Sequence, residues 1–154
     1  MCIFTGDFSA KLDSKGRFQF PSAFMERIGT EGDSSVRTFV IKRDIYEKCL
    51  TIYTMSSWQS RVETVKSHLN PFNRQHNAFL REFFKDTAEV QLDASNRLLV
   101  PKRLLLQAEL KSDICVLGLD DRIEVWDTDI YNQNRLSTDQ FAQMAQDFLG
   151  GINI

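Results

Sequence analysis

The chain has 154 residues, of which 42% are hydrophobic and 26% are charged, and its formal net charge is −2. This composition is typical of a folded globular protein and excludes a disordered chain. The three cysteines lie far apart and form no CxxC pair, which disfavours a secreted disulfide scaffold and a zinc module. No apolar run is long enough to span a membrane, and the first residues lack the pattern of a signal peptide, so we expect a cytoplasmic protein.

The charge is unevenly distributed along the chain. Residues 1–85 hold 13 Lys and Arg against 9 Asp and Glu, a net charge of +4, whereas residues 86–154 hold 6 against 12, a net charge of −6. Such a chain can present a basic surface and an acidic surface. Charges that only keep the surface soluble would account for the same numbers, so the asymmetry by itself leaves the function open.

The first elements predicted along the chain are two strands joined by a tight turn. Apolar residues alternate at Phe8, Ala10 and Leu12, which indicates a strand with one buried side. A turn follows, then a short strand over 17–20. Pro21 suits the first position of a helix, which we expect to end near Ile28. Two further strands are predicted over about 36–42 and 49–53.

Two helices are predicted in the middle of the chain. The first covers about 57–69, with Ser56 or Ser57 as its N-cap and one apolar face formed by Trp58, Val62, Val65 and Leu69. Asn70-Pro71 ends this helix. The second covers about 71–85 and places Phe72, His76, Phe79 and Phe83 on one stripe. We expect an antiparallel helical hairpin whose aromatic stripe serves as core or subunit interface rather than as a base-stacking platform.

An internal repeat organises the rest of the sequence. The segment LDSKGRFQFPSAF (Leu12–Phe24) matches LDASNRLLVPKRL (Leu92–Leu104) at an offset of 80, and LTIYTMSSW (Leu50–Trp58) matches IEVWDTDIY (Ile123–Tyr131) at an offset of 73. The first copy therefore carries seven additional residues, which we place in the Gly- and Ser-rich segment Ile28–Arg37. Two tandem copies of one unit predict an intrachain pseudo-dimer.

The second copy repeats the order of the first. Strands are predicted over 88–92, 97–100, 114–119 and 122–126, with a helix to about Ala108 and a turn at Asp120-Asp121. A final helix over about 128–148 ends at Gly150-Gly151. We therefore expect an α+β protein with four segments: the first repeat (1–56), the helical hairpin (57–86), the second repeat (87–127), and a C-terminal helix with its tail (128–154).

Motifs that would carry catalysis are missing from the sequence. There is no P-loop, no GxGxxG, no GxSxG and no HExxH. His68 and His76 are separated by a predicted helix break, so we expect surface or interface histidines rather than metal ligands. Cys49 and Cys115 have no neighbouring histidine, so we expect them to pack as small apolar groups rather than to act as nucleophiles. We therefore predict a protein that is not an enzyme and that uses no metal, cofactor or small-molecule substrate.

Two Asp-x-x-x-Arg turns are the most informative residues in the chain. In each turn the aspartate ends one strand and the arginine begins the next, so the carboxylate can cap N–H groups of the turn and hold the guanidinium as a bidentate pair. Gly16 and Asn96 occupy the same place in the two turns and are the residue types that best tolerate a positive φ. The aspartates and arginines are Asp13 with Arg17 and Asp93 with Arg97.

The first turn carries additional positive charge. Lys11 and Lys15 bring residues 11–17 to a local charge of +2, whereas the second copy has Gln91 and Ser95 at those places. A fixed arginine beside lysines suits phosphate binding and bidentate reading of guanine in a major groove. The alternative is that both Asp–Arg pairs only brace their hairpins. In that case the chain would be a ring-forming protein-interaction module without affinity for DNA.

These features resemble the MraZ family. The resemblance rests on the two DxxxR turns, the proline that follows each arginine by four residues, the aromatic second block and the helical hairpin between the copies, and it covers almost the whole chain. It implies two AbrB-like, swapped-hairpin β-barrel halves in tandem. It also implies a bacterial transcriptional regulator of the division and cell-wall gene cluster, which assembles as a ring and binds short G-rich direct repeats of double-stranded DNA upstream of its own operon, in the nucleoid.

The resemblance also implies residue roles. The DNA-contacting arginine of the family corresponds to Arg17, with Lys15 beside it and Asp13 as its brace, and Arg97 with Asp93 are the equivalents in the second copy. The second turn departs from the family pattern because Asn96 replaces glycine before the arginine. Since asparagine tolerates the left-handed conformation, the turn remains feasible.

Overall fold

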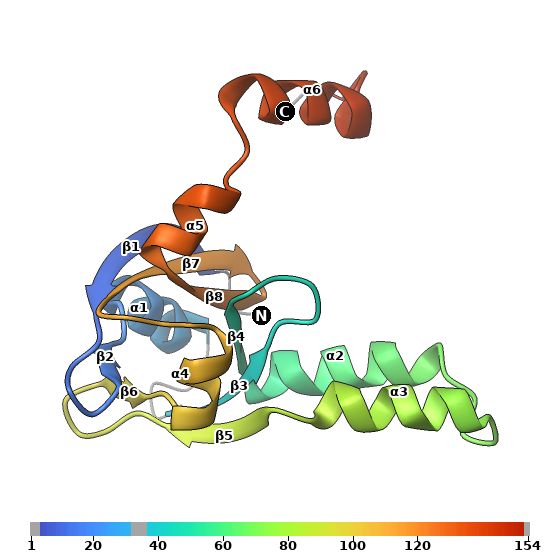
Figure 1. Cartoon of the computed structure of the whole chain (residues 1–154), viewed down its shortest axis with the longest axis horizontal. Helices are drawn as coiled ribbons and strands as arrows, with labels where there is room; N and C mark the ends of the chain where they lie inside the picture. Colours follow the sequence, from blue (N-terminus) through green and yellow to red (C-terminus); the bar gives the residue numbers. More distant parts are fainter. Residues whose placement is uncertain (1–3, 32–36, 153–154) are drawn as a thin grey trace.

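The computed structural model describes residues 4–31 and 37–152 (Figure 1). The first half contains β1 (Phe4–Lys11), β2 (Arg17–Gln19), α1 (Ser22–Glu31), β3 (Thr38–Arg43), β4 (Leu50–Thr54), α2 (Met55–Ser67) and α3 (Arg74–Phe84). The second half contains β5 (Thr87–Gln91), β6 (Arg97–Leu99), α4 (Lys102–Gln107), β7 (Asp113–Asp120), β8 (Arg122–Asp127), α5 (Thr128–Asn134) and α6 (Thr138–Leu149). The predicted α+β class and the repeated element order are confirmed.

The strands form one six-stranded antiparallel sheet and one two-stranded ribbon. The sheet has the order β1-β7-β8-β4-β3-β5, and the ribbon pairs β2 with β6. The first strand of each copy pairs with a strand of the other copy, because β1 pairs with β7 and β5 pairs with β3. The two copies thus exchange strands, which makes them inseparable parts of one folded unit and confirms the swapped arrangement.

The strand register contains a pseudo-two-fold axis. At the centre of the sheet, Leu50 pairs with Val125 and Ile52 pairs with Ile123, although the repeat alignment equates Leu50 with Ile123 and Ile52 with Val125. Pairing of equivalent positions in this reciprocal way is the signature of two-fold symmetry. The axis passes between Thr51 and Glu124, which face each other. The predicted intrachain pseudo-dimer is confirmed.

The seven additional residues of the first copy are divided between two places, which corrects the prediction. Leu12 N–H donates to the Ser112 carbonyl and Leu92 N–H donates to the Arg37 carbonyl, so Arg37 and Ser112 are equivalent at an offset of 75 (112 − 37). Five additional residues therefore precede β3. The other two residues lengthen the β3–β4 loop. In the first copy this loop joins the paired residues Arg43 and Leu50, whereas in the second copy the equivalent loop joins Gly118 and Ile123, which are two residues closer in the sequence. Part of the predicted insertion, 32–36, lies outside the described residues.

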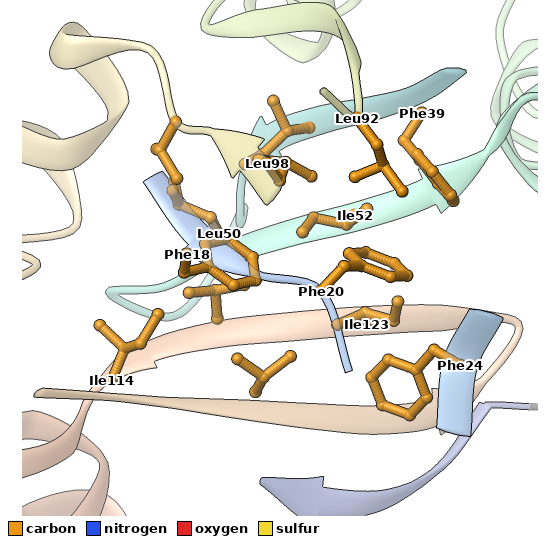
Figure 2. Packing of buried hydrophobic residues seen from close by; sticks show 14 of the residues in the cluster. Phe18, Phe20, Phe24, Phe39, Leu50, Ile52, Leu92, Leu98, Ile114 and Ile123 are labelled. Carbon is orange, nitrogen blue, oxygen red and sulfur yellow. The ribbon is translucent and has the colours of Figure 1, made fainter. Parts of the chain in front are cut away.

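The main hydrophobic core is shared by both copies (Figure 2). Phe18, Phe20 and Phe24 of the first copy are at most 1% exposed, and so are their counterparts Leu98, Val100 and Leu104 of the second. The rings of Phe20 and Phe24 make an edge-on contact, with centroids 6.0 Å apart. The inner side chains of the ribbon, Phe18 from the first copy and Leu98 from the second, pack onto the sheet. Burial of these side chains therefore fixes the position of the ribbon.

The helical hairpin projects from the body of the molecule (Figure 1). The helix α2 begins two residues earlier than predicted, and its N-cap is Thr54, whose hydroxyl accepts the Ser57 N–H, rather than Ser56 or Ser57. Stacking of Trp58 on Phe83, with ring centroids 5.6 Å apart, anchors the hairpin at its base. Phe72 precedes α3 and is 95% exposed, so its predicted place on the helical stripe is wrong.

The C-terminal region consists of two helices where one was predicted. The break between α5 and α6 falls at residues 135–137, where Ser137 forms a capping box with Gln140 and begins a new helix. A strong N-cap inside an apolar periodic segment restarts the helix in a new direction. None of the described helices has the length and apolar character needed to cross a bilayer.

Pro21 and Pro101, the prolines of the two repeats, occupy the N-cap of a helix rather than its first position. The helices begin one residue later, at Ser22 and Lys102. The Pro21 carbonyl accepts the Phe24 N–H at 3.0 Å, and the Pro101 carbonyl accepts the Leu104 N–H at 2.9 Å. The fixed φ of proline therefore sets the entry into each helix from just outside it.

Candidate nucleic-acid interface

The first turn is held together by one carboxylate. Asp13 Oδ1 accepts the N–H groups of Lys15 and Arg17, both at 2.9 Å, while Asp13 Oδ2 accepts from Arg17 Nε at 2.8 Å. The predicted bidentate pair is wrong, because only Nε of the guanidinium contacts the carboxylate. No described residue hydrogen-bonds to the two terminal amino groups of Arg17. These groups are left as donors on a guanidinium whose position is set by Asp13.

The second turn repeats this geometry. Asp93 Oδ1 accepts the N–H groups of Ser95 and Arg97 at 2.9 Å, and Asp93 Oδ2 accepts from Arg97 Nε at 2.9 Å. Asn96 has a φ of +61° where Gly16 has +84°. The expectation that asparagine sustains the same turn is confirmed.

Both aspartates are stabilised in their charged form. The backbone N–H of Arg17 and, after it, the Arg17 side chain lower the pKa of Asp13 below its ordinary value of 3.8. The backbone N–H of Arg97 lowers the pKa of Asp93 in the same way. Each turn therefore contains an ionised carboxylate at neutral pH.

The two turns lie at the opposite ends of one short antiparallel ribbon, β2–β6, which the sequence did not predict. Phe20 N–H donates to the Asn96 carbonyl at 3.0 Å, and Val100 N–H donates to the Gly16 carbonyl at 2.9 Å. Each turn is thus bonded to the strand that follows the other turn. The turns and the ribbon β2–β6 form one continuous surface at one end of the molecule (Figure 1).

The outer face of the ribbon carries both arginines. Because Phe18 and Leu98 point into the core, their neighbours on the strands point outward. These neighbours are Arg17, Gln19, Arg97 and Leu99. The side chains of the two arginines are 26% and 36% exposed, so they are accessible although their bases are packed. Gln19 and Leu99 were missed in the sequence, where the alternation around Phe18 and Leu98 was the available signal.

The two predicted lysines differ in their surroundings. Lys15 is exposed in the first turn. Lys11 lies at the end of β1, where its Nζ is 3.0 Å from Asp113 Oδ1 across the β1–β7 pair. An opposite charge at this distance compensates the charge of Lys11 locally. Lys15 is consequently the stronger source of positive potential beside Arg17.

Side chains of the first copy brace the second turn. Gln19 Nε2 donates to the Ser95 carbonyl at 3.0 Å and to the Asn96 carbonyl at 3.3 Å. Arg37 Nη2 donates to the Asp93 carbonyl. In the second copy, Leu99 is the equivalent of Gln19 and Ser112 is the equivalent of Arg37. Among the described residues, no side chain of the second copy makes the equivalent hydrogen bonds to the first turn. The two turns therefore share one geometry but have different neighbours.

One group of possible metal ligands occurs among the described residues, away from the turns. Ligand atoms of Asp44, Cys49 and Glu124 lie within 4.8 Å of one another. Asp44 Oδ2 already accepts the N–H groups of Tyr46 and Glu47, and Cys49 is fully buried. Burial raises the pKa of the Cys49 thiol, which keeps it protonated and makes it a poor ligand. The expectation that Cys49 packs as a small apolar group is confirmed.

Comparison with known proteins identifies the family. The family model described as "MraZ protein, putative antitoxin-like" matches the chain twice, over residues 3–82 and over residues 83–148. The chain belongs to the MraZ family. The double match agrees with the internal repeat, and the resemblance inferred from the DxxxR turns is confirmed.

Curated relatives of the MraZ family match nearly the whole chain. "Transcriptional regulator MraZ" of Phocaeicola vulgatus is 30% identical over 150 residues, covering 97% of this chain and 96% of the relative. The protein of the same name from Cytophaga hutchinsonii is 32% identical with the same coverage of both chains. That of Flavobacterium psychrophilum is 32% identical over 154 residues, covering 99% of this chain and 96% of the relative.

Proposed function

We propose that this protein is a sequence-specific DNA-binding transcriptional regulator and that the ribbon β2–β6 with its two turns contacts the DNA. One observation carries the proposal: Arg17 and Arg97, each held at Nε by an aspartate, lie diagonally across the ribbon on one outward face, with their terminal amino groups available. The names of the curated relatives support the same class of function.

The geometry suits the major groove. A two-stranded ribbon fits into this groove, and a guanidinium can donate both terminal amino groups to O6 and N7 of guanine. In this proposal Arg17 and Arg97 read bases, and Asp13 and Asp93 hold them in place. Lys15 contacts phosphate, and Lys11 adds to the positive potential. Gly16 and Asn96 allow the turns to form.

We extend the proposal to the target and assembly that the family resemblance implies. The chain acts in the cytoplasm, at the nucleoid, on its own division and cell-wall gene cluster. It binds short G-rich direct repeats of double-stranded DNA as a ring of identical subunits, without enzymatic activity or cofactor. A ring would repeat the same DNA-contacting surface, so weak contacts on repeated sites would add through avidity.

The helix α6 supports assembly. It extends away from the body (Figure 1), and its apolar stripe, which contains Phe141 and Phe148, is exposed. Isolated helices of this length are marginal in water, and most helical stability in proteins comes from packing an apolar face. The helix therefore requires a surface to pack on. We propose that this surface belongs to a second copy of the chain.

The groove on the helical hairpin offers that surface. It has a volume of about 470 Å³ and is lined mainly by Val65, Leu69, Phe79 and the two histidines His68 and His76. Residues 55–85 hold five Lys and Arg against two Glu, whereas α6 holds two Asp and no basic residue. Because α6 and the hairpin leave the body in different directions (Figure 1), α6 of one chain can dock on the hairpin of the next. Such head-to-tail contacts close into a ring when the rotation between subunits permits it.

A second candidate function is an interaction module that assembles but does not bind DNA. It is favoured by the ion pairs themselves, since Asp13–Arg17 and Asp93–Arg97 would brace hairpins in any protein. This module would form the same oligomer and would show no salt-dependent affinity for DNA.

Selection of bound duplexes from random DNA separates the two functions. We expect the wild-type protein to enrich a spaced, G-rich repeat. Arg17→Ala should abolish specific binding in a gel-shift assay while the circular dichroism spectrum stays unchanged. Lys85→Ala, which removes an equal charge from an exposed position between α3 and β5, is the matched control. Binding of Arg17→Ala with wild-type affinity would overturn the proposed role of the ribbon.

A further inference from the structure

The outer face of the ribbon is symmetric in its arginines and asymmetric in its other two residues. The pseudo-two-fold axis relates Arg17 to Arg97 and relates Gln19 to Leu99. Gln19 is polar, whereas Leu99 is apolar and 51% exposed. If this face binds the edges of bases, its two halves therefore present different side chains to the DNA.

The register places Leu99 directly opposite Arg17. Residues that face each other in an antiparallel pair have Cα atoms about 4.5–5.5 Å apart. Neighbouring base pairs in duplex DNA are separated by about 3.4 Å along the axis. If Arg17 reaches the edge of one base pair, Leu99 lies at the height of an adjacent one.

We propose that Leu99 contacts the 5-methyl group of a thymine in the base pair next to the one read by Arg17, so that each chain reads an asymmetric DNA sequence. This inference rests on the proposed DNA-binding function. In the major groove the thymine methyl is the apolar feature of an A·T pair, and apolar side chains are its partners. Leu99 is the apolar member of the outward face.

Gln19 cannot take the equivalent role on the other side. Its amide nitrogen donates to the Ser95 and Asn96 carbonyls, so it is engaged in holding the second turn. The base pair beside the one read by Arg97 therefore meets a polar, immobilised amide. The exchange of Lys15 for Ser95 adds a second difference between the two sides. A palindromic sequence would match only one side of this ribbon.

Position distinguishes Leu99 from other exposed apolar residues. Single exposed leucines are ordinary on protein surfaces and require no explanation. Leu106 is exposed to a larger extent, 68%, but it lies on α4 rather than on the outward face of the ribbon. Leu99 differs because it shares that face with both arginines. Leu106→Ala is therefore a control that removes an equally large exposed side chain.

Replacement of thymine by deoxyuridine tests the proposal. The probe is a duplex selected from random DNA by the wild-type protein, in which each thymine is replaced in turn, because this change removes only the methyl group. We expect one replacement to weaken wild-type binding about fourfold, as loss of one buried methyl group predicts. Leu99→Ala should bind the thymine and deoxyuridine duplexes equally, and Leu106→Ala should keep the wild-type difference.

Each remaining outcome rejects a specific claim. If wild-type protein binds the duplex tightly but no deoxyuridine replacement matters, or if Leu99→Ala keeps the difference, the role of Leu99 is overturned while the proposed function stands. If the wild-type protein selects no duplex, both the proposed function and this inference fail. Strict preference for a palindrome would overturn the asymmetric reading.

Discussion

Phe18 and Leu98 face each other at the centre of the ribbon β2–β6, and the pseudo-two-fold axis passes between them. Both are at most 1% exposed. Because side chains alternate along a strand, burial of this pair directs Arg17 and Arg97 outward. The orientation of the candidate DNA-reading residues is thus a consequence of core packing by their neighbours.

The first prediction concerns the carboxylate that holds Arg17. Asp13→Asn keeps an oxygen for the turn N–H groups but removes the negative charge that attracts the guanidinium. We expect specific affinity to fall by about tenfold, while binding to a scrambled duplex stays constant or rises. Gel-shift titrations with both duplexes measure the ratio.

Asp113→Asn is the control for this experiment. It removes the same charge from an exposed ion pair with Lys11 and leaves the ribbon untouched. Specific affinity should be retained or slightly increased, because the charge of Lys11 is no longer compensated. An equal loss of specificity in both variants would show that the net charge, and not the position of Arg17, matters.

The second prediction concerns the backbone of the first turn. Gly16 has a φ of +84°, and a Cβ added there would lie 2.9 Å from Leu105 Cδ1. Gly16→Ala should therefore lower the free energy of unfolding by about 1–2 kcal/mol. Asn96→Gly should change it by only about 0.5 kcal/mol in either direction, since the turn already accepts the left-handed conformation there. Urea denaturation measures both, and equal stability of the two variants would contradict this account.

The third prediction concerns pH. The folded-state pKa values of Asp13 and Asp93 lie below the ordinary value of 3.8, so their contribution to stability is present above that value and is lost as the pH falls through the folded-state pKa. Between about pH 5 and pH 8 these groups should leave stability and turn geometry unchanged. Carboxyl carbon chemical shifts from NMR follow each titration. A midpoint for Asp13 at or above 3.8 would refute the proposed hydrogen bonding.

The fourth prediction concerns assembly. Phe141→Asp combined with Phe148→Asp places charge on the exposed apolar stripe of α6 and should leave a monomer of 17.8 kDa, as measured by light scattering. Gln143→Asp combined with Gln146→Asp adds the same charge to exposed positions on the opposite side of the helix and should assemble like the wild type. A wild-type oligomer formed by the first variant would exclude α6 as the docking helix.

Local patterns in the sequence were sufficient to predict the internal repeat and the two turns. Leucine, aspartate, arginine and proline recur at the same spacing, and the residues before the arginines tolerate a positive φ, so the two turns could be predicted without coordinates. These properties depend on residues that are adjacent in the chain. Sterics and short-range hydrogen bonds decide them.

Several local predictions nevertheless failed where alternatives were close in energy. Ser56, Ser57 and Thr54 can all cap a helix, and in the structure the N-cap is Thr54, the last residue of β4. The final helix satisfies one apolar periodicity but contains Ser137, which caps a new helix. The single Nε contact of each arginine was also unpredictable, since the second carboxylate oxygen is occupied by the backbone of the turn.

The sequence by itself determined that the chain has two related halves, each with an aspartate-held arginine in a tight turn. Only the tertiary structure decided that the two turns flank one ribbon at its opposite ends, that Arg17 faces Leu99 and that Gln19 braces the second turn. These relationships join residues about 80 positions apart, and they arise because the two copies exchange strands to bury one common core. Burial of apolar surface acts on the whole chain at once, so its outcome cannot be read from neighbouring residues.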